Sequence, residues 1–156
     1  MASIDSVADK VIWSAQHLIA LKAEIPGYLN NEPCEVTAEA EPGTNRLISR
    51  LRTKVPIPVS IPLRIGDCFQ NLRSALDYLV WELVLAAGNI PTNEHQFPIC
   101  NKAEAFKDAV KRGRLKRISP EALAEIERFQ PYHTSAGGAL KLINDFANIN
   151  KQRKAN

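Results

Sequence analysis

The sequence predicts a mainly α protein of the α+β class, a bundle of about five helices with one small β-hairpin between the first and second helices. Long stretches repeat apolar residues at helical spacing, and one short region instead alternates around a Pro-Gly turn. Glycine and proline then divide the later chain into helix-sized pieces. With 156 residues, 45% hydrophobic and 24% charged, the chain is expected to form a single domain, residues 1–156, that can bury a core.

Residues 3 to about 29 are expected to form one or two amphipathic helices, with Pro26-Gly27 fraying the end. The pattern indicates packing rather than chemistry. The recurring residues are Ile4, Val7, Val11, Ala15, Leu18, Leu21 or Ile25, and Tyr28.

A β-hairpin is expected at about 34–59. Residues 34–40 and 47–59 alternate in character on either side of the turn Glu41-Pro42-Gly43-Thr44-Asn45. Because Pro56 and Pro58 remove donors on one side only, the second strand should lie at an edge or continue as extended polyproline. Such a segment suits a wall or a dimer contact.

The longest helix is expected from about Ser60 to Ala87, opened by Ser60 and closed by Gly88 at the C′ position. Three shorter helices should follow at about 101–112, 119–129 and 136–152. Ser119-Pro120 predicts the start of the second of these, Gln130-Pro131 its end, and Gly137-Gly138 precede the third.

Several classes of protein are disfavoured by composition. No run approaches the roughly 18 apolar residues of a membrane span, and the N-terminus lacks the pattern of a signal peptide. The three cysteines, Cys34, Cys68 and Cys100, are too far apart for a disulfide framework or a zinc knuckle. We therefore expect a cytoplasmic protein with no metal, no cofactor and no membrane partner.

Positive charge gathers in the second half of the chain. Residues 102–117 hold seven Lys or Arg against Glu104 and Asp108, a density that can attract a phosphate backbone through counterion release. A solvated helix end and linker would look the same. The candidate nucleic-acid patch consists of Lys107, Lys111, Arg112, Arg114, Lys116 and Arg117.

Two of the expected helices carry polar stripes opposite their apolar faces. On the wheel the central helix aligns Asp67, Gln70, Asn71, Ser74, Asp77 and Tyr78, with Arg73 at the edge. The last helix aligns Lys141, Asn144, Asp145, Asn148, Lys151 and Gln152. If the helices are neighbours, the stripes could converge as a hydrogen-bonded network or a phosphate site; otherwise they are solvated faces.

The central helix contains Gly66-Asp67-Cys68-Phe69-Gln70-Asn71-Leu72-Arg73-Ser74-Ala75-Leu76-Asp77-Tyr78-Leu79-Val80-Trp81. It resembles the signature of a bacterial family whose members often read G-D-x-x-H-N-L-R-S-A-L-D-H-L. The resemblance extends to the segments 96–99, 129–132 and 148–153, and relatives usually continue beyond Arg153, so we expect a naturally short or a trimmed form. The helix is also similar to the R-x4-H motif of HEPN domains, helical modules of prokaryotic toxin–antitoxin and phage-defence systems that cleave RNA without metal.

The resemblance implies a catalytic site, and the departures from the family pattern imply that its activity is impaired. It implies that Arg73, Asp77 and Tyr78 are the catalytic residues. In these roles Arg73 stabilises the charge on the phosphorane, Asp77 orients Arg73, and Tyr78 positions or donates a proton. Histidines of the family are replaced by Gln70, Tyr78 and Gln152, and tyrosine, with a pKa near 10, is a poor general base. We therefore expect binding of RNA or nucleotide phosphate, with impaired or lost ribonuclease activity. The implied phosphate or ligand residues are Asn71, Asn148, Lys151, Gln152 and Arg153.

Other functions remain open at this stage. One alternative is a non-enzymatic homodimeric interaction module in which the polar stripes meet across a two-fold axis. A cognate antitoxin is a further possible partner. A small-molecule sensor with its ligand between helices is a third alternative.

Overall fold

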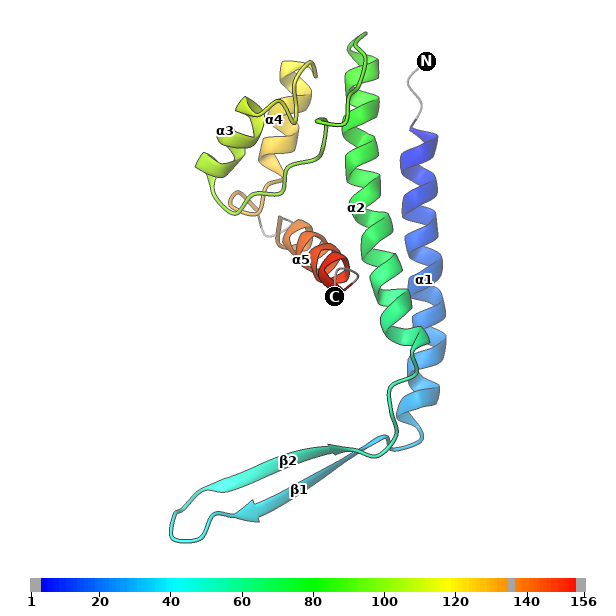
Figure 1. The fold of residues 1–156 in the computed structure, drawn as a ribbon, viewed down its shortest axis with the longest axis vertical. Coiled ribbons are helices and arrows are strands. Elements are labelled where there is room, and N and C mark those ends of the chain that lie inside the picture. The colour runs from blue at the N-terminus through cyan, green and yellow to red at the C-terminus, as the bar shows by residue number, and fades with distance from the viewer. Residues whose placement is uncertain (1–3, 135–136, 154–156) are drawn as a thin grey trace.

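The computed structural model describes residues 4–134 and 137–153, and the side chains of residues 150–153 lie outside that description. It confirms the mainly α fold with a small hairpin between the first two helices (Figure 1). None of the helices in the described ranges is long and apolar enough to cross a membrane. The elements are α1 (Asp5–Leu29), β1 (Cys34–Ala40), β2 (Leu47–Thr53), α2 (Ser60–Ala86), α3 (Ala103–Lys111), α4 (Pro120–Arg128) and α5 (Gly137–Arg153).

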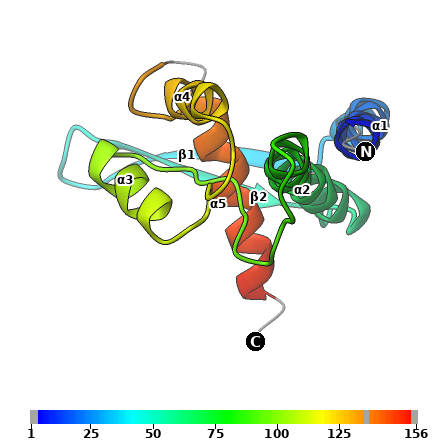
Figure 2. The same ribbon diagram turned by 90° about the horizontal axis from the view of Figure 1, so that it is seen from above.

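Helix α2 is the central element of the molecule. The long helices α1 and α2 lie side by side, and the hairpin extends from their lower end as an arm (Figure 1). Seen from above, α1 lies on one side of α2, whereas α5, α4 and α3 lie on the other (Figure 2). Both sides of α2 are therefore covered, whereas among the described elements α1 has α2 as its neighbour on one side alone.

Helix α1 is one continuous helix that runs through Pro26. The apolar residues that the sequence places on one stripe of α1 are partly buried and partly exposed. Leu21 is buried, whereas Val11 and Leu18 remain about half exposed. Part of the apolar surface of α1 is thus left uncovered by residues 4–134 and 137–153.

The hairpin is shorter than expected. Strand β2 ends at Thr53 rather than Val59, and residues 54–59 form a connector to α2. Pro56 and Pro58 have no amide hydrogen to donate to a neighbouring strand. The pairing with β1 therefore does not continue into the segment that holds them. All fourteen strand residues are exposed, with Val36 directly opposite Leu51 and Ala38 opposite Ser49.

Local sequence signals predict the C-terminal end of α2 better than they predict its N-cap. Ser60 is not the N-cap; Val59 occupies that position, and the Ser60 hydroxyl donates to Glu24 of α1. The C-terminus follows the prediction, because Gly88 adopts a φ of 74° and its amide donates to the Leu85 carbonyl at 2.9 Å. The Asn89 amide reaches the Val84 carbonyl at 3.1 Å, which completes a Schellman motif.

The shorter helices begin close to their expected positions. Ser119 caps α4 by accepting a hydrogen bond from the Ala122 amide at 3.2 Å, and Pro120 is the first helical residue. Helix α3 is one or two residues shorter at each end than expected, and Gly137 belongs to α5 instead of preceding it. A Cβ on Gly137 would lie 2.5 Å from the Pro131 Cα, so the chain needs glycine at this close approach.

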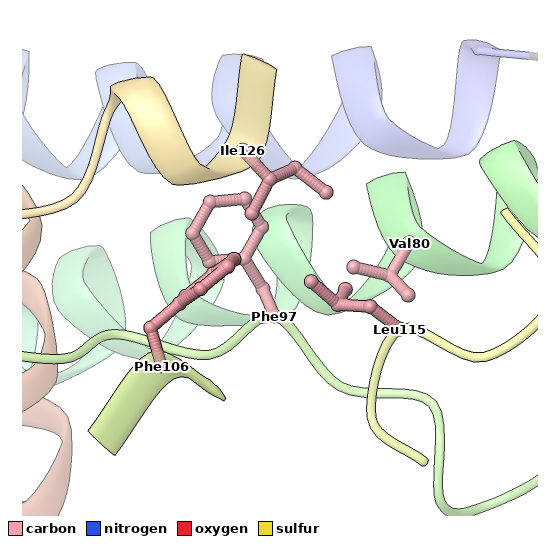
Figure 3. Packing of buried hydrophobic residues seen from close by; sticks show 5 residues of the cluster. All are labelled: Val80, Phe97, Phe106, Leu115 and Ile126. Carbon is pink, nitrogen blue, oxygen red and sulfur yellow. The ribbon is translucent and has the colours of Figure 1, made fainter. Parts of the chain in front are cut away.

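The core lies between α2, α3, α4 and the loops that join them. Its central residues point toward one another (Figure 3). The wholly buried Gln130 holds this region together, because its amide donates to the Pro98 and Ile126 carbonyls and its carbonyl accepts from the Cys100 amide. The cluster consists of Val80, Phe97, Phe106, Leu115 and Ile126.

Candidate functional site: the Arg73 clamp and the basic segment

Arg73 and Asp77 of α2 together bind the backbone of one loop residue. Arg73 Nη2 lies 2.9 Å from Asp77 Oδ1 and donates to the Phe97 carbonyl at 2.8 Å. Asp77 Oδ1 also accepts from the Phe97 amide at 2.9 Å. Both polar groups of the Phe97 backbone are thus satisfied by one ion pair. We call this pair and its bonds to Phe97 the Arg73 clamp; it fixes the loop that carries Phe97 into the core.

The environment of Arg73 is largely buried. Its side chain is 11% exposed, against 31% for Asp77. Burial lowers the pKa of Arg73, the nearby charge of Arg114 lowers it further, and Asp77 opposes both effects. The guanidinium therefore has its hydrogen bonds and its counter-charge inside the protein.

Tyr78 lies on a different side of α2. Tyr78 is 41% exposed, and Lys10 Nζ of α1 lies 5.9 Å from its ring centroid. With Ser6, Trp81 and Glu82 it lines a shallow hollow of about 390 Å³. The structure thus brings Arg73 and Asp77 together but places Tyr78 against α1.

As far as the side chains are described, the polar stripes of α2 and α5 do not meet where these helices touch. The contact is made by the apolar faces, with the rings of Phe69 and Phe146 stacked at 4.5 Å between centroids and 9° between planes. Asn71 donates to the Asp67 carbonyl of its own helix at 2.8 Å, and Asn148 is exposed on α5. The side chains of Lys151, Gln152 and Arg153 lie outside the described residues.

The basic segment, residues 107–117, begins on α3 and continues through the following loop. Lys107 and Lys111 are exposed on α3, and Lys111 Nζ lies 3.9 Å from Asp108. The loop turns at Gly113 and Arg117, whose φ angles are 87° and 68°. Arg114 is half-buried, whereas the other loop cations are exposed: Arg112, Lys116 and Arg117.

Hydrogen bonds from the preceding loop hold the backbone of the basic segment. His95 is 4% exposed, and its Nδ1 accepts from the Thr92 amide at 2.8 Å. The ring proton is therefore on Nε2, which donates to the Lys116 carbonyl at 2.9 Å. The Asn89 side chain donates to the Arg117 carbonyl at 3.2 Å. The backbone of this loop is thus fixed while the side chains of Arg112, Lys116 and Arg117 are exposed.

A small polar hollow adjoins the basic segment. Its volume is about 190 Å³, and Arg112, Arg114 and Asp108 line it together with Cys100 and two alanines. Burial raises the pKa of the Cys100 thiol, and the charge of Arg114 partly opposes this rise. Arg114 therefore acts electrostatically on both Cys100 and Arg73, which connects the Arg73 clamp with the basic segment.

A larger hollow of about 520 Å³ lies between α2, α4 and α5 and is almost entirely apolar. Glu125 is the charged residue in its lining, and this carboxylate is paired with Arg128 at 2.8 Å. The hollow offers little to orient a polar ligand. The basic segment is therefore the better candidate site.

Sequence reasoning found the charged residues of the region but missed the residues that position them. His95 and Gln130 gave no signal beyond a loop histidine and a helix end, because their partners are far away in the sequence. In comparisons with protein-family models, curated proteins and solved structures, nothing matches this chain.

Proposed function

We propose that this protein binds RNA through the phosphate backbone at the basic segment and does not cleave it. The observation that carries the proposal is a loop whose backbone is fixed by His95 and Asn89 while its cations remain exposed. A fixed loop loses less conformational entropy on binding than a flexible one.

The charge of the segment supports a polyanionic ligand. Lysine and arginine that neutralise phosphates release counterions, and this release supplies most of the affinity in sequence-independent binding. No aromatic residue is interleaved in residues 111–117, so base stacking is not available there. The expected binding is therefore sensitive to salt and tolerant of sequence.

The arrangement around Arg73 argues against catalysis. Its guanidinium already binds Asp77 and the Phe97 carbonyl, and Tyr78 lies near Lys10 on the other side of α2. A metal-independent ribonuclease needs a group that donates or accepts a proton beside the phosphate-binding charge. At their described positions, Arg73 and Tyr78 do not place such a proton-transfer group beside a phosphate-binding charge.

The test measures RNA binding and cleavage together. Fluorescently labelled single-stranded RNA is incubated with wild type at low and moderate salt, with and without chelator. Arg112→Ala/Lys116→Ala removes two exposed cations from the segment, and Arg46→Ala/Lys141→Ala removes two exposed cations elsewhere. We expect the first variant to weaken binding by about tenfold or more, because each lost phosphate contact removes counterion release, and the second to bind like wild type.

Two results would contradict the proposal. Equal RNA affinities for the two double variants would show that RNA binds outside the basic segment. Chelator-resistant cleavage that disappears in Arg73→Ala would show a working ribonuclease.

A further inference from the structure

Helix α1 packs against α2 along a heptad seam. Ser14 Oγ lies 3.0 Å from Cys68 Sγ, Lys10 lies over Tyr78, and Glu24 contacts Arg64 at 3.3 Å. These positions repeat at intervals of three and four residues, as in helix pairs of the coiled-coil type. The full series is Val7, Lys10, Ser14, His17, Leu21, Glu24 and Tyr28.

A second heptad series runs along α1, one residue after the first. We call it the exposed seam. Four of its five large apolar members are substantially exposed, with the N-cap Ile4 at 66%, Val11 at 47%, Leu18 at 49% and Leu29 at 57%, whereas Ile25 is half-buried. The series is Ile4, Ala8, Val11, Ala15, Leu18, Lys22, Ile25 and Leu29.

The period of the exposed seam specifies a helical partner. A strict alternation of four and three residues keeps one face of a helix against another helix over several turns. Helix α1 has 25 residues, so at a rise of 1.5 Å per residue the seam follows a helix roughly 37 Å long. Exposed apolar surface that is continuous along a helix often marks an interaction site. Figure 2 shows α1 at the outside of the described chain, with α2 on one flank.

We propose that the exposed seam packs against the same seam of a second copy of this chain, as an antiparallel coiled coil. Lys22 decides the orientation. In a parallel pair, Lys22 would face its own counterpart, which places like charges together. In an antiparallel pair centred between Ala15 and Leu18, Lys22 instead lies beside Val11 of the second copy.

In two of its four layers the antiparallel register also matches a large side chain with a small one, because Ala8 lies opposite Ile25 and Ala15 opposite Leu18. The end layer pairs two large apolar residues, Ile4 and Leu29. Alternation of large and small residues across facing positions allows helices to interdigitate without voids. The seam is thus complementary to itself across a two-fold axis, which closes the assembly at two copies. This inference does not depend on RNA binding.

The first experiment measures self-association of the full chain by sedimentation equilibrium. We expect a dimer at micromolar concentration. Leu18→Glu should raise the dissociation constant by about a hundredfold or more, because it buries an unpaired charge in the seam. Leu63→Glu makes the same change at a 61% exposed leucine on α2 and should leave the constant within about threefold. Circular dichroism checks that both variants are folded.

The second experiment tests the role and the orientation of Lys22. Lys22→Leu should tighten the dimer by about tenfold, since a single polar residue in a seam costs stability while fixing register. A spin label on Ala8→Cys, with Cys34→Ser, reports orientation. The antiparallel register separates the two labelled backbones by about 25 Å along the axis, whereas a parallel pair would hold them within about 10 Å.

Three results would overturn the proposal. A wild type that remains monomeric at about 100 μM would show that no second copy occupies the seam. A dimer unaffected by Leu18→Glu would use another surface. A short distance between the Ala8→Cys labels would contradict the antiparallel orientation.

Discussion

Arg73 and Asp77, one turn apart on α2, share a 2.9 Å ion pair whose members also bind the carbonyl and the amide of Phe97. A pair at this spacing on an exposed helix is worth only a few tenths of a kcal/mol. Here burial and the backbone of Phe97 change its role. The pair anchors the loop that precedes α3 and carries one of the core phenylalanines.

The Arg73 clamp should contribute far more to stability than an exposed pair. Arg73→Ala leaves the Phe97 carbonyl without its donor and the Asp77 carboxylate without its counter-charge, so we expect a loss of about 2–3 kcal/mol in the free energy of unfolding. Arg128→Ala removes an exposed i,i+3 pair with Glu125 and should cost at most about 1 kcal/mol. Urea unfolding followed by circular dichroism compares the two, and equal losses would contradict the clamp.

Two adjacent glycines at the start of α5 should respond oppositely to alanine. A Cβ on Gly137 would lie 2.5 Å from the Pro131 Cα and 2.6 Å from the Gln130 carbonyl oxygen, so the backbone must shift. Gly137→Ala should therefore cost about 1–3 kcal/mol. Gly138 has open space around it, and Gly138→Ala should be neutral or stabilise by up to about 1 kcal/mol. A destabilised Gly138→Ala together with a neutral Gly137→Ala would refute the packing at this helix start.

Tyr132 should make stability fall at high pH. Burial, together with the nearby Glu127 that accepts from its hydroxyl at 3.2 Å, raises the pKa of Tyr132 to about 12. Between pH 10 and about 12 the unfolded chain loses this proton while the folded chain keeps it. Stability present below pH 10 is therefore lost as pH rises through this range.

Tyr132→Phe isolates this contribution. Melting temperatures of both proteins are compared from pH 9 to 12, and the wild type should fall relative to the variant above pH 10. Parallel curves for the two proteins would mean that Tyr132 is not perturbed.

The hairpin should be the least protected regular element. All residues of β1 and β2 are exposed, and an isolated two-stranded hairpin is at best marginally stable in water. Amide hydrogen exchange should therefore be fast in both strands and slow around the wholly buried Val80 and Val84 of α2. Protection of the strands equal to that of α2 would indicate a cover over the hairpin.

Local signals in the sequence predicted element ends well where the cause is local. Gly88 ends α2 because it alone adopts the left-handed conformation there, and Ser119 caps α4 through its own hydroxyl. Helix α2 begins at Ser60 as predicted, but Ser60 does not cap it, because its hydroxyl binds Glu24 of another helix. The length of β2 was overestimated because extended residues before a proline need not pair.

The candidate site was predictable in its charges but not in its geometry. The density of lysine and arginine in residues 102–117 is visible in the sequence, whereas the bonds from His95 and Asn89 that fix the loop depend on the fold. The separation of Arg73 from Tyr78 could have been anticipated, because five residues correspond to about 140° around a helix. The role of Arg73 at Phe97 could not, since the two residues meet only in the folded chain.

The salt dependence of RNA affinity tests the central claim most directly. The dissociation constant for single-stranded RNA is measured from about 20 to 200 mM salt for wild type, Arg112→Ala/Lys116→Ala and Arg46→Ala/Lys141→Ala. With each phosphate contact contributing about 0.7 to the log–log slope, the first double variant should reduce the slope by about 1.4. The second should keep the wild-type slope. Binding that is absent at low salt, or slopes that fall equally in both variants, would contradict RNA binding at the basic segment.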